Sequence, residues 1–366
     1  MAITRIGNPA IADVRGVNFR NIIINGGMDI AQRATSATGL GNGDGGFHTC
    51  DRWKFGESGS TSAEFTQTQS TDVPTGQGFS TSLKMDCTTA DASPGSGDLI
   101  FIGQKIEGQN LQYLKKGTSS AESTTVSFWV KSNKTGTYIV NLYDNDNTRS
   151  INKSYTISSA DTWEKKTITF AGDTTGTLGN DNGSSLILYF NLSAGSNFTS
   201  GTLDTSWNAY VAANYAVGQV NLADSTSNEW YVTGVQLETS SQASDFEFLP
   251  FDYQLRSCQR YYYQTYDYGT AAGTATLTGV PQRFTDATSN YASLQIFHPV
   301  PMRSAPTVVI YNPTTGATGS GTTDGNATVN MNSTRKSQKY THLNADGVSV
   351  SQSASIRCHI TADAEL

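Results

Sequence analysis

Acidic side chains are the first residues in this sequence that could do chemistry. Glycoside hydrolysis needs two carboxylates that flank a sugar in a cleft, and the chain carries 31 Asp and Glu residues. So many acids create accidental pairs, and those in "LYDNDNT" and "TADASPGSGD" stand in segments typical of turns. No repeat of fixed period, as in a long β-helix, accompanies them. We therefore expect no catalytic residue and a protein that is not an enzyme.

Motifs for metals and nucleophiles are missing from the sequence. The four cysteines are far apart and form no Cys-x-x-Cys pair, so we expect free thiols that pack as small apolar side chains. The histidines share no metal-ligand spacing. Neither a Gly-x-Ser-x-Gly elbow nor a Gly-rich phosphate loop with its lysine occurs. These patterns predict no metal and no cofactor. The residues are Cys50, Cys87, Cys258, Cys358, His48, His298, His342 and His359.

The run Asp144-Asn145-Asp146-Asn147 is similar to the start of a calcium loop, because oxygen ligands at alternate positions suit Ca²⁺. The similarity ends there, since no glycine stands at the sixth position and no glutamate closes the loop. We interpret the run as the tip of a hairpin.

Aromatic residues are the side chains best suited to bind a sugar, because pyranose faces stack on rings. Trp129 and Trp230 alternate within strand-like segments and are expected in the core. Trp207 lies in the irregular segment "LDTSWNAYVAANYAVG", where Tyr210 and Tyr215 could join it on an exposed patch. We therefore name Trp207, Tyr210 and Tyr215 as candidate glycan-binding residues. Packing explains Trp207 equally well.

Composition and patterning predict the elements that must position these residues. Charged residues make up 15% of the chain, against about 25% in typical globular proteins. Short strand-like segments follow one another between residues 53 and 238. The segment "TTVSFWVKSNKTGTYIVNLYDN" is predicted to form two alternating strands, "DLIFIGQKIEG" a buried strand and "SSLILYFNLSAG" a further strand. This pattern predicts an all-β fold, an antiparallel jelly-roll-like β-sandwich. The segment at 22–24 is also expected to be a strand.

Charge and hydropathy limit the partners. The net charge is −7 and no basic cluster is present, so we expect no nucleic acid to bind. No window reaches the roughly 18 apolar residues of a membrane span, which predicts no membrane insertion. The first 19 residues lack the apolar core of a signal peptide, so we expect synthesis in a cytosol.

The segment "GVQLETSSQASDFEFLPFDYQLRSCQRYYYQ", residues 234–264, is the most distinctive in the chain. Pro250 favours a helix over about 252–262 that links the sandwich to a second, smaller β-domain. We therefore predict an attachment arm at 1–20, the sandwich at 21–250 and the second domain at 251–366. Side chains of the linking segment are predicted to fill a domain or subunit interface, where tyrosine is favoured. They are Phe251, Leu255, Cys258, Tyr261, Tyr262 and Tyr263.

Several segments together resemble a family of phage tail fibres and virion appendages whose jelly-roll domain is like those of carbohydrate-binding modules. They are "NIIINGGMDIAQRATS", "CDRWKF", "VSFWVKSNKTGTYIVNLYDN", "WEKKTITFAGDTTGTL", "VPMRSAPTV", the final "DAEL" and, most specifically, residues 233–263.

This resemblance implies a structural protein of the virion that forms a homotrimer and recognises polysaccharide on the host surface. It implies that the N-terminal arm docks on other virion proteins and that the protein is made in the host cytoplasm and released by lysis. A capsid decoration or head fibre with a purely structural role is the alternative. The resemblance also leaves a structural calcium ion open.

Overall fold

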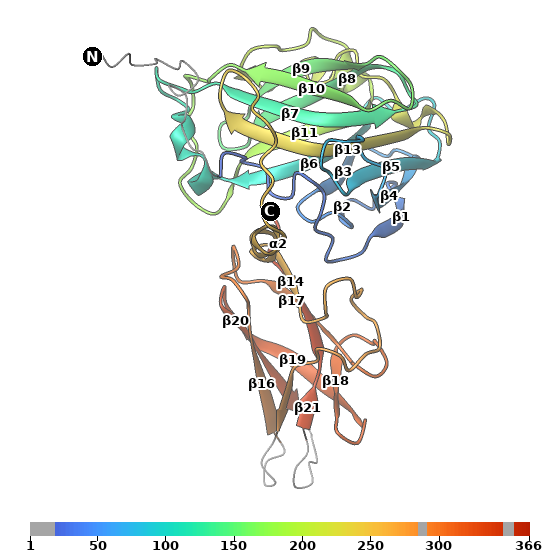
Figure 1. Ribbon diagram of the computed structural model, residues 1–366, viewed down its shortest axis with the longest axis vertical. Coiled ribbons are helices and arrows are strands. Elements are labelled where there is room, and N and C mark those ends of the chain that lie inside the picture. The colour runs from blue at the N-terminus through green and yellow to red at the C-terminus, as the bar shows by residue number, and fades with distance from the viewer. Residues whose placement is uncertain (1–18, 285–290, 347–354) are drawn as a thin grey trace, which may run out of the picture.

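The computed structural model describes residues 19–284, 291–346 and 355–366. Two bodies of β-structure are joined at helix α2 (Phe251–Gln259), and the chain ends beside this junction (Figure 1). The predicted all-β fold, with an antiparallel sandwich, a short linking helix and a smaller second β-domain, is confirmed. The predicted N-terminal arm falls almost wholly outside the described residues, so its role stays a prediction.

The first domain consists of two antiparallel sheets that face each other. In spatial order the six-stranded sheet contains β1 (Ser36–Leu40), β4 (Glu64–Ser70), β5 (Ser82–Thr89), β13 (Glu229–Thr239), β7 (Thr124–Ser132) and β10 (Glu164–Phe170). The seven-stranded sheet contains β12 (Asn208–Ala209), β9 (Arg149–Ile157), β8 (Gly136–Asp144), β11 (Ser184–Ala194), β6 (Leu99–Glu107), β3 (Lys54–Ser58) and β2 (Gly46–Phe47).

The loops of the first domain, all within the described residues, contain five short helices. They are η1 (Gly108–Asn110), η2 (Gln112–Leu114), α1 (Ser196–Thr199), η3 (Ala212–Asn214) and η4 (Leu222–Asp224). In the described part of the chain, no helix is long and apolar enough to cross a membrane.

The second domain has two smaller antiparallel sheets. One contains β14 (Tyr262–Gln264), β22 (His359–Asp363) and β17 (Thr307–Tyr311). The other contains β15 (Gln282–Phe284), β21 (Ser355–Arg357), β18 (Ser320–Thr323), β19 (Thr328–Lys336), β20 (Tyr340–Asp346) and β16 (Tyr291–Phe297). Its core is separate from that of the sandwich and includes Leu294, Leu343 and Ile356.

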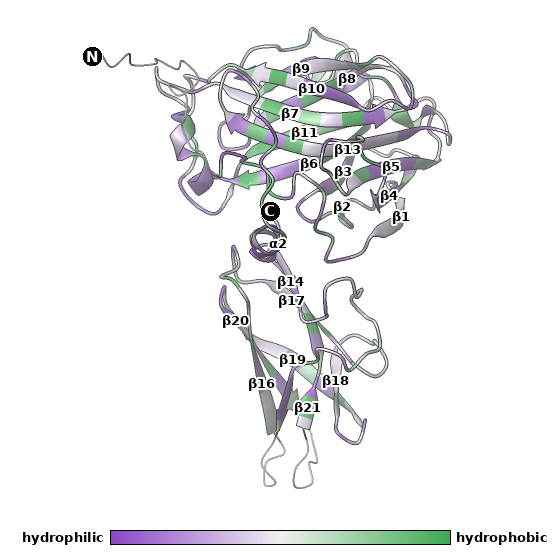
Figure 2. Ribbon diagram, in the orientation of Figure 1, coloured by the Kyte–Doolittle hydropathy of each residue, from purple (hydrophilic) through white to green (hydrophobic). Residues whose placement is uncertain are grey.

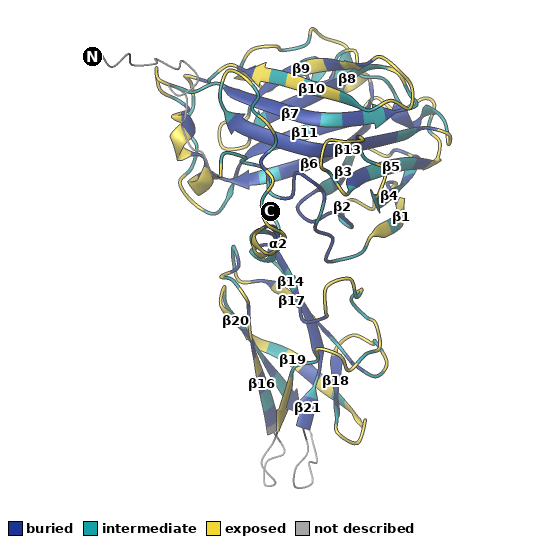
Figure 3. Ribbon diagram, viewed as in Figure 1, coloured by how far each residue is buried: buried dark blue, intermediate teal, exposed yellow. Residues whose placement is uncertain are grey.

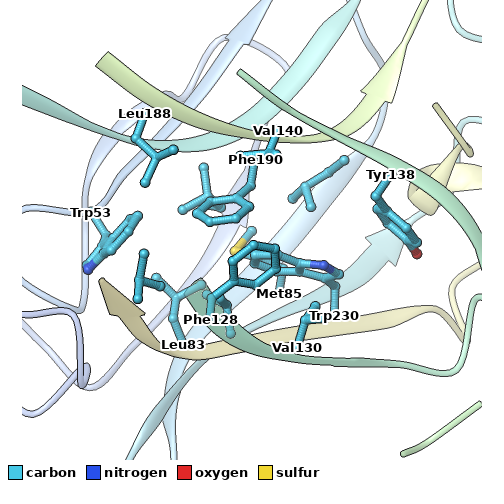
Figure 4. Packing of buried hydrophobic residues seen from close by; sticks show 14 of the residues in the cluster. Trp53, Leu83, Met85, Phe128, Val130, Tyr138, Val140, Leu188, Phe190 and Trp230 are labelled. Atoms are coloured by element: carbon cyan, nitrogen blue, oxygen red, sulfur yellow. The ribbon is translucent and has the colours of Figure 1, made fainter. Parts of the chain in front are cut away.

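The sandwich core lies between its two sheets. The rings of Phe128 and Phe190 meet edge to face with their centroids 4.9 Å apart, and the ring centroids of Trp230 and Phe190 are 5.8 Å apart (Figure 4). Figure 2 shows the alternation of apolar and polar residues along β7, and Figure 3 shows that the edge strand β10 is much more exposed. Trp230 is buried as expected, whereas Trp129 is only half-buried because it points away from this core.

Three sequence-based expectations need correction. Residues 22–24 form no strand, because the side chain of Gln104 bonds both the N–H and the C=O of Ile24 at 2.9 Å in place of a ladder. The helix ends at Gln259 and not near Tyr262, because Tyr262 pairs with Asp363 in a sheet. Strands β4 and β9 were not predicted, since their sequences "EFTQTQS" and "RSINKSYTI" are rich in polar residues.

Candidate glycan-binding face

The outer face of the seven-stranded sheet gathers aromatic, amide and basic side chains. Residues that pair across antiparallel strands point to the same face. One row of cross-strand partners runs over β6, β11, β8 and β9 through Gly103, Tyr189, Asn141 and Asn152. On the other side of β6, Lys54 of β3 is paired with Gly103 and continues the same row. The row beside it contains Lys105, Ile187, Tyr143 and Ser150. These two rows form the floor of the candidate glycan-binding face.

Two aromatic rings of this face lie against glycine residues of the neighbouring strand. A Cβ atom added to Gly103 would stand 2.7 Å from the ring of Tyr189, and one added to Gly56 would overlap the ring of Phe101. The two rings contact each other edge to face, with centroids 4.6 Å apart. Both residues are half-buried, and both also pack against a hydrophobic cluster of Leu99, Tyr215 and Ala216, so each ring is held in place and keeps part of its surface exposed. A flat, supported ring is the platform that a sugar ring can stack on.

A second pair of tyrosines extends the face toward β9. The ring of Tyr143 contacts Tyr210 with centroids 5.6 Å apart, and Tyr210 contacts Tyr215 at 5.3 Å. Burial first, and then the neighbouring Tyr143 and Tyr210, raise the pKa of Tyr189 well above its ordinary value. Its phenol therefore stays protonated at neutral pH and can both donate and accept a hydrogen bond with a sugar hydroxyl.

A chain of buried asparagines fixes the loop that carries Tyr210. Asn141 Nδ2 donates to Asn152 Oδ1 at 2.7 Å and to the C=O of Tyr215 at 2.9 Å. Asn152 Nδ2 donates to the C=O of Asn214 at 3.1 Å. Because these amides are fully buried, breaking them would leave unpaired polar groups. The loop is thereby held against the sheet and covers one side of the aromatic face.

The three predicted glycan-binding residues do not lie together. Tyr210 is half-buried beside Tyr143 on the outer face, as the preceding paragraphs describe. Tyr215 is 4% exposed and packs in a hydrophobic cluster with Leu99 and Ala216, so the expectation that it lines an exposed patch is wrong. Trp207 packs against the sandwich core, and its Nε1 donates to the C=O of Ala171 at 2.8 Å. Glycan contact at Trp207 and Tyr210 stays a prediction.

The Asp144 to Asn147 run is the turn between β8 and β9. Asp144 Oδ1 accepts the N–H groups of Asp146 and Asn147 at 3.0 Å. Its other carboxylate oxygen bonds the buried ammonium of Lys116, which also contacts Asp173 at 2.9 Å and the carbonyls of Thr175 and Gly176 at 3.0 Å. A lysine ammonium thus stands where a cation would sit in an oxygen cage. Among the described residues, no cluster of three or more His, Cys, Asp or Glu could hold a metal ion.

Several residues predicted for an interface contact the first domain directly. Arg52 lies 3.4 Å from the ring centroid of Tyr261, and Arg33 lies 3.8 Å from that of Tyr262. Both arginines belong to the first domain and both also pair with Glu365 near the chain end. The rings and the chain end therefore share two arginines of the sandwich, and these contacts lie at the junction of the two domains.

The remaining predicted interface residues are placed differently. Cys258 is buried, Leu255 is half-buried, and Phe251 is 50% exposed with its ring 5.2 Å from Tyr268. Tyr263 packs against the core of the second domain, because neighbours along β14 point to opposite faces. Its assignment to an interface between the two domains is therefore corrected, and a contact of Tyr263 with another subunit stays a prediction. All four cysteines are free and buried, as predicted.

Sequence reasoning missed four residues of the outer face: Phe101, Tyr189, Lys54 and Lys105. A signal was present, because Phe101, Gly103 and Lys105 alternate with buried Ile residues in "LIFIGQKIE". What was missing is the register that sets Gly103 opposite Tyr189.

Comparison with known proteins leaves the family of this chain open. No protein-family model matches the chain, and no curated protein matches it. Among solved structures, it is similar to the enzymatically active domain of tailspike protein 4 of bacteriophage CBA120, with 16% identity and a TM-score of 0.30 over 56% of this chain and 21% of that chain.

Carbohydrate-binding modules are also among the similar structures. A family 11 module from Clostridium thermocellum in complex with a mixed-linked tetrasaccharide has 13% identity and a TM-score of 0.29 over 57% of this chain and 97% of that chain. The module TmCBM61, in complex with beta-1,4-galactotriose, has 8% identity and a TM-score of 0.31 over 61% of this chain and 100% of that chain. At these values the comparison carries no argument about what this protein binds.

Proposed function

We propose that the protein binds glycan through the outer face of the seven-stranded sheet, without cleaving it. The observation that carries this proposal is the pair of half-buried rings, Phe101 and Tyr189, each seated on a glycine of the neighbouring strand. The hydroxyl groups of the tyrosines on this face can supply hydrogen bonds to sugar hydroxyls. A shallow face of this kind suits weak single-site binding that gains strength when several copies engage one surface.

We further propose, from the sequence resemblance, that this protein is a virion appendage such as a tail fibre and that the bound glycan is host surface polysaccharide. Three copies per assembly follow from the same resemblance. The second domain supports self-association, because large apolar side chains are exposed there. These are Leu277, Phe284, Phe297 and Val309, each at least 37% exposed. Sedimentation of the purified chain as a stable monomer would overturn the trimer.

Binding is tested with host surface polysaccharide in affinity electrophoresis. Tyr189→Ala and Phe101→Ala should each weaken binding at least tenfold, whereas Tyr113→Ala, an exposed ring on η2 of the first domain, should not. Unchanged binding by the first two variants would contradict the assignment of this face. Release of reducing ends from the polysaccharide would contradict the non-enzymatic role.

Position on the virion is tested by immunogold labelling with an antibody against the second domain. We expect label at the tail. Label over the head would favour the alternative, a capsid decoration or head fibre, which the exposed apolar side chains of the second domain would equally serve. Absence of label from intact virions would overturn the virion role.

A further inference from the structure

Two lysines lie on the candidate glycan-binding face beside the ring of Tyr189. Lys54 on β3 pairs with Gly103 on β6, and Tyr189 on β11 pairs with the same glycine from the other side. Lys105 follows Gly103 by two residues and so points to the same face. Lys54 and Lys105 are therefore diagonal neighbours across two strands, with Cα atoms roughly 7–8 Å apart.

These lysines have no carboxylate partner in the described part of the chain. Basic residues nearby do have one: Arg33 and Arg52 pair with Glu365, and Arg260 pairs with Glu107. Both lysines are half-buried, which limits how far water can screen their charges. Like charges placed so close repel each other unless an anion joins them.

The charges that surround Lys105 are mostly positive. Burial first, and then Lys54, Arg303 and Arg52, lower the pKa of Lys105. Glu365 is the one acid that acts in the other direction, and its carboxylate is already bonded to Arg33 and Arg52. The protein as a whole is acidic, with 31 acidic and 24 basic residues. The face thus presents local positive charge on a negatively charged molecule.

We propose that the glycan bound here is anionic, and that its carboxylate, sulfate or phosphate groups pair with Lys54 and Lys105 while a sugar ring stacks on Tyr189. This inference rests on the proposed glycan-binding function of the same face. Lys54 is paired with Gly103, the residue against which the Tyr189 ring lies, and Lys105 is two residues further along the same strand, so long lysine side chains at both positions can reach a charged substituent on a stacked sugar. Charge pairing selects acidic chains, and the ring supplies contact that any pyranose can make.

The test compares polymers that differ only in charge. Full-length protein is titrated with polygalacturonate and with its methyl-esterified form, and separately with dextran sulfate and with dextran, at low and at physiological salt. We expect at least tenfold tighter binding to one charged polymer than to its neutral counterpart, weakened by salt. The pair that shows this difference distinguishes a carboxylate from a sulfate ligand, and dextran phosphate against dextran tests the third group.

Matched variants separate this inference from the proposed function. The double variant Lys54→Gln/Lys105→Gln should lose the preference for charge and keep its thermal stability, whereas Lys336→Gln/Lys339→Gln, at exposed sites of the second domain, should keep the preference. Equal binding of neutral and charged polymers, lost in Tyr189→Ala, would overturn the anionic ligand and leave the glycan-binding face intact. If the control variant loses as much of the preference for charged polymers as the double variant does, the attraction is non-specific, and the inference of an anionic ligand at this face is overturned. Absence of binding to every polymer would count against both proposals.

Discussion

Arg260 holds the carboxylate of Glu107 through two hydrogen bonds, from Nε to Oε1 at 2.8 Å and from Nη2 to Oε2 at 2.7 Å. The two residues are 153 positions apart. Glu107 ends strand β6 of the sandwich, and Arg260 directly follows helix α2. The hydroxyl of Tyr261 donates to the same carboxylate. The strand that carries Phe101 and Lys105 is therefore tied at its end to the second domain.

Removing the charge of Glu107 should destabilise the junction. The Glu107 side chain is fully buried, and breaking one member of a buried pair costs about 3–5 kcal/mol. We expect Glu107→Gln to lower the free energy of unfolding in urea by about that amount. Lys115→Gln, which breaks a more exposed pair with Glu122, is the control and should cost about 1 kcal/mol or less. Equal losses in the two variants would contradict a special role for the Glu107–Arg260 pair.

Acid should weaken the same contact. Burial opposes ionisation of Glu107, but hydrogen bonds from Arg260 and Tyr261 outweigh it and lower the pKa of Glu107. A lowered pKa in the folded state gives stability that is present above the pKa of the unfolded chain, about 4.3, and is lost as the pH falls through the folded value. The difference in the free energy of unfolding between wild type and Glu107→Gln, measured in urea, should therefore become smaller below about pH 4. A gap that is constant down to the lowest pH at which the protein folds would refute this.

The contribution of Asp51 to the stability of the folded protein should have the opposite dependence on pH. It is buried beside Gln32 and Arg33, and burial, outweighing these partners, raises the pKa of Asp51 to about 6. The folded state binds this proton more tightly, so the stabilising contribution is full below about pH 4 and is lost as the pH rises through 6. The shift corresponds to about 3 kcal/mol. Wild type should therefore lose stability relative to Asp51→Asn between pH 4 and 7, measured by urea unfolding.

The control for this pH series is Asp252→Asn, at an exposed position of α2. The difference in unfolding free energy between wild type and this variant should vary little over the same range. A free energy of unfolding of wild type that rises, or stays constant, relative to that of Asp51→Asn between pH 4 and 7 would contradict the raised pKa of Asp51.

Gly103 should control the position of the Tyr189 ring. A Cβ atom at residue 103 would stand 2.7 Å from the ring, closer than a side chain tolerates. We expect Gly103→Ala to displace the ring and to weaken polysaccharide binding at least fivefold. Gly97→Ala is the matched control, because its Cβ atom would meet only the amide of Asn197 at 3.9 Å. Binding by Gly103→Ala equal to that of the control would show that the ring does not support the ligand.

Lys116 should act as the internal cation of the loop after β8. Lys116→Ala leaves the buried carboxylates of Asp144 and Asp173 without their shared ammonium, and we expect a loss of about 3–5 kcal/mol. Carboxylate and carbonyl oxygens suit Ca²⁺, so millimolar calcium chloride should raise the Tm of this variant and leave wild type unchanged. Lys134→Ala, which breaks a pair exposed by about a third, is the control. A Tm response to calcium in wild type would contradict the internal cation.

The sequence alone determined the all-β architecture and most of its strands. The short, mostly apolar runs "DLIFIGQKIEG" and "SSLILYFNLSAG" predicted β6 and β11, because such runs between turn residues favour buried strands. Pro250 and the pattern after it predicted α2 in the right place. These features depend on local periodicity and backbone restriction, which adjacent residues specify.

The candidate site, in contrast, was decided by the tertiary structure. Trp207, Tyr210 and Tyr215 are close in sequence, yet Asn141 and Asn152 hold their loop so that Tyr215 is buried and Trp207 packs against the core. The seat of Tyr189 on Gly103 and the approach of Lys54 to Lys105 follow from strand register, which a single sequence does not state. Register is fixed by burial of whole sheet faces. Side chains from four distant strands therefore meet only after the sandwich has formed.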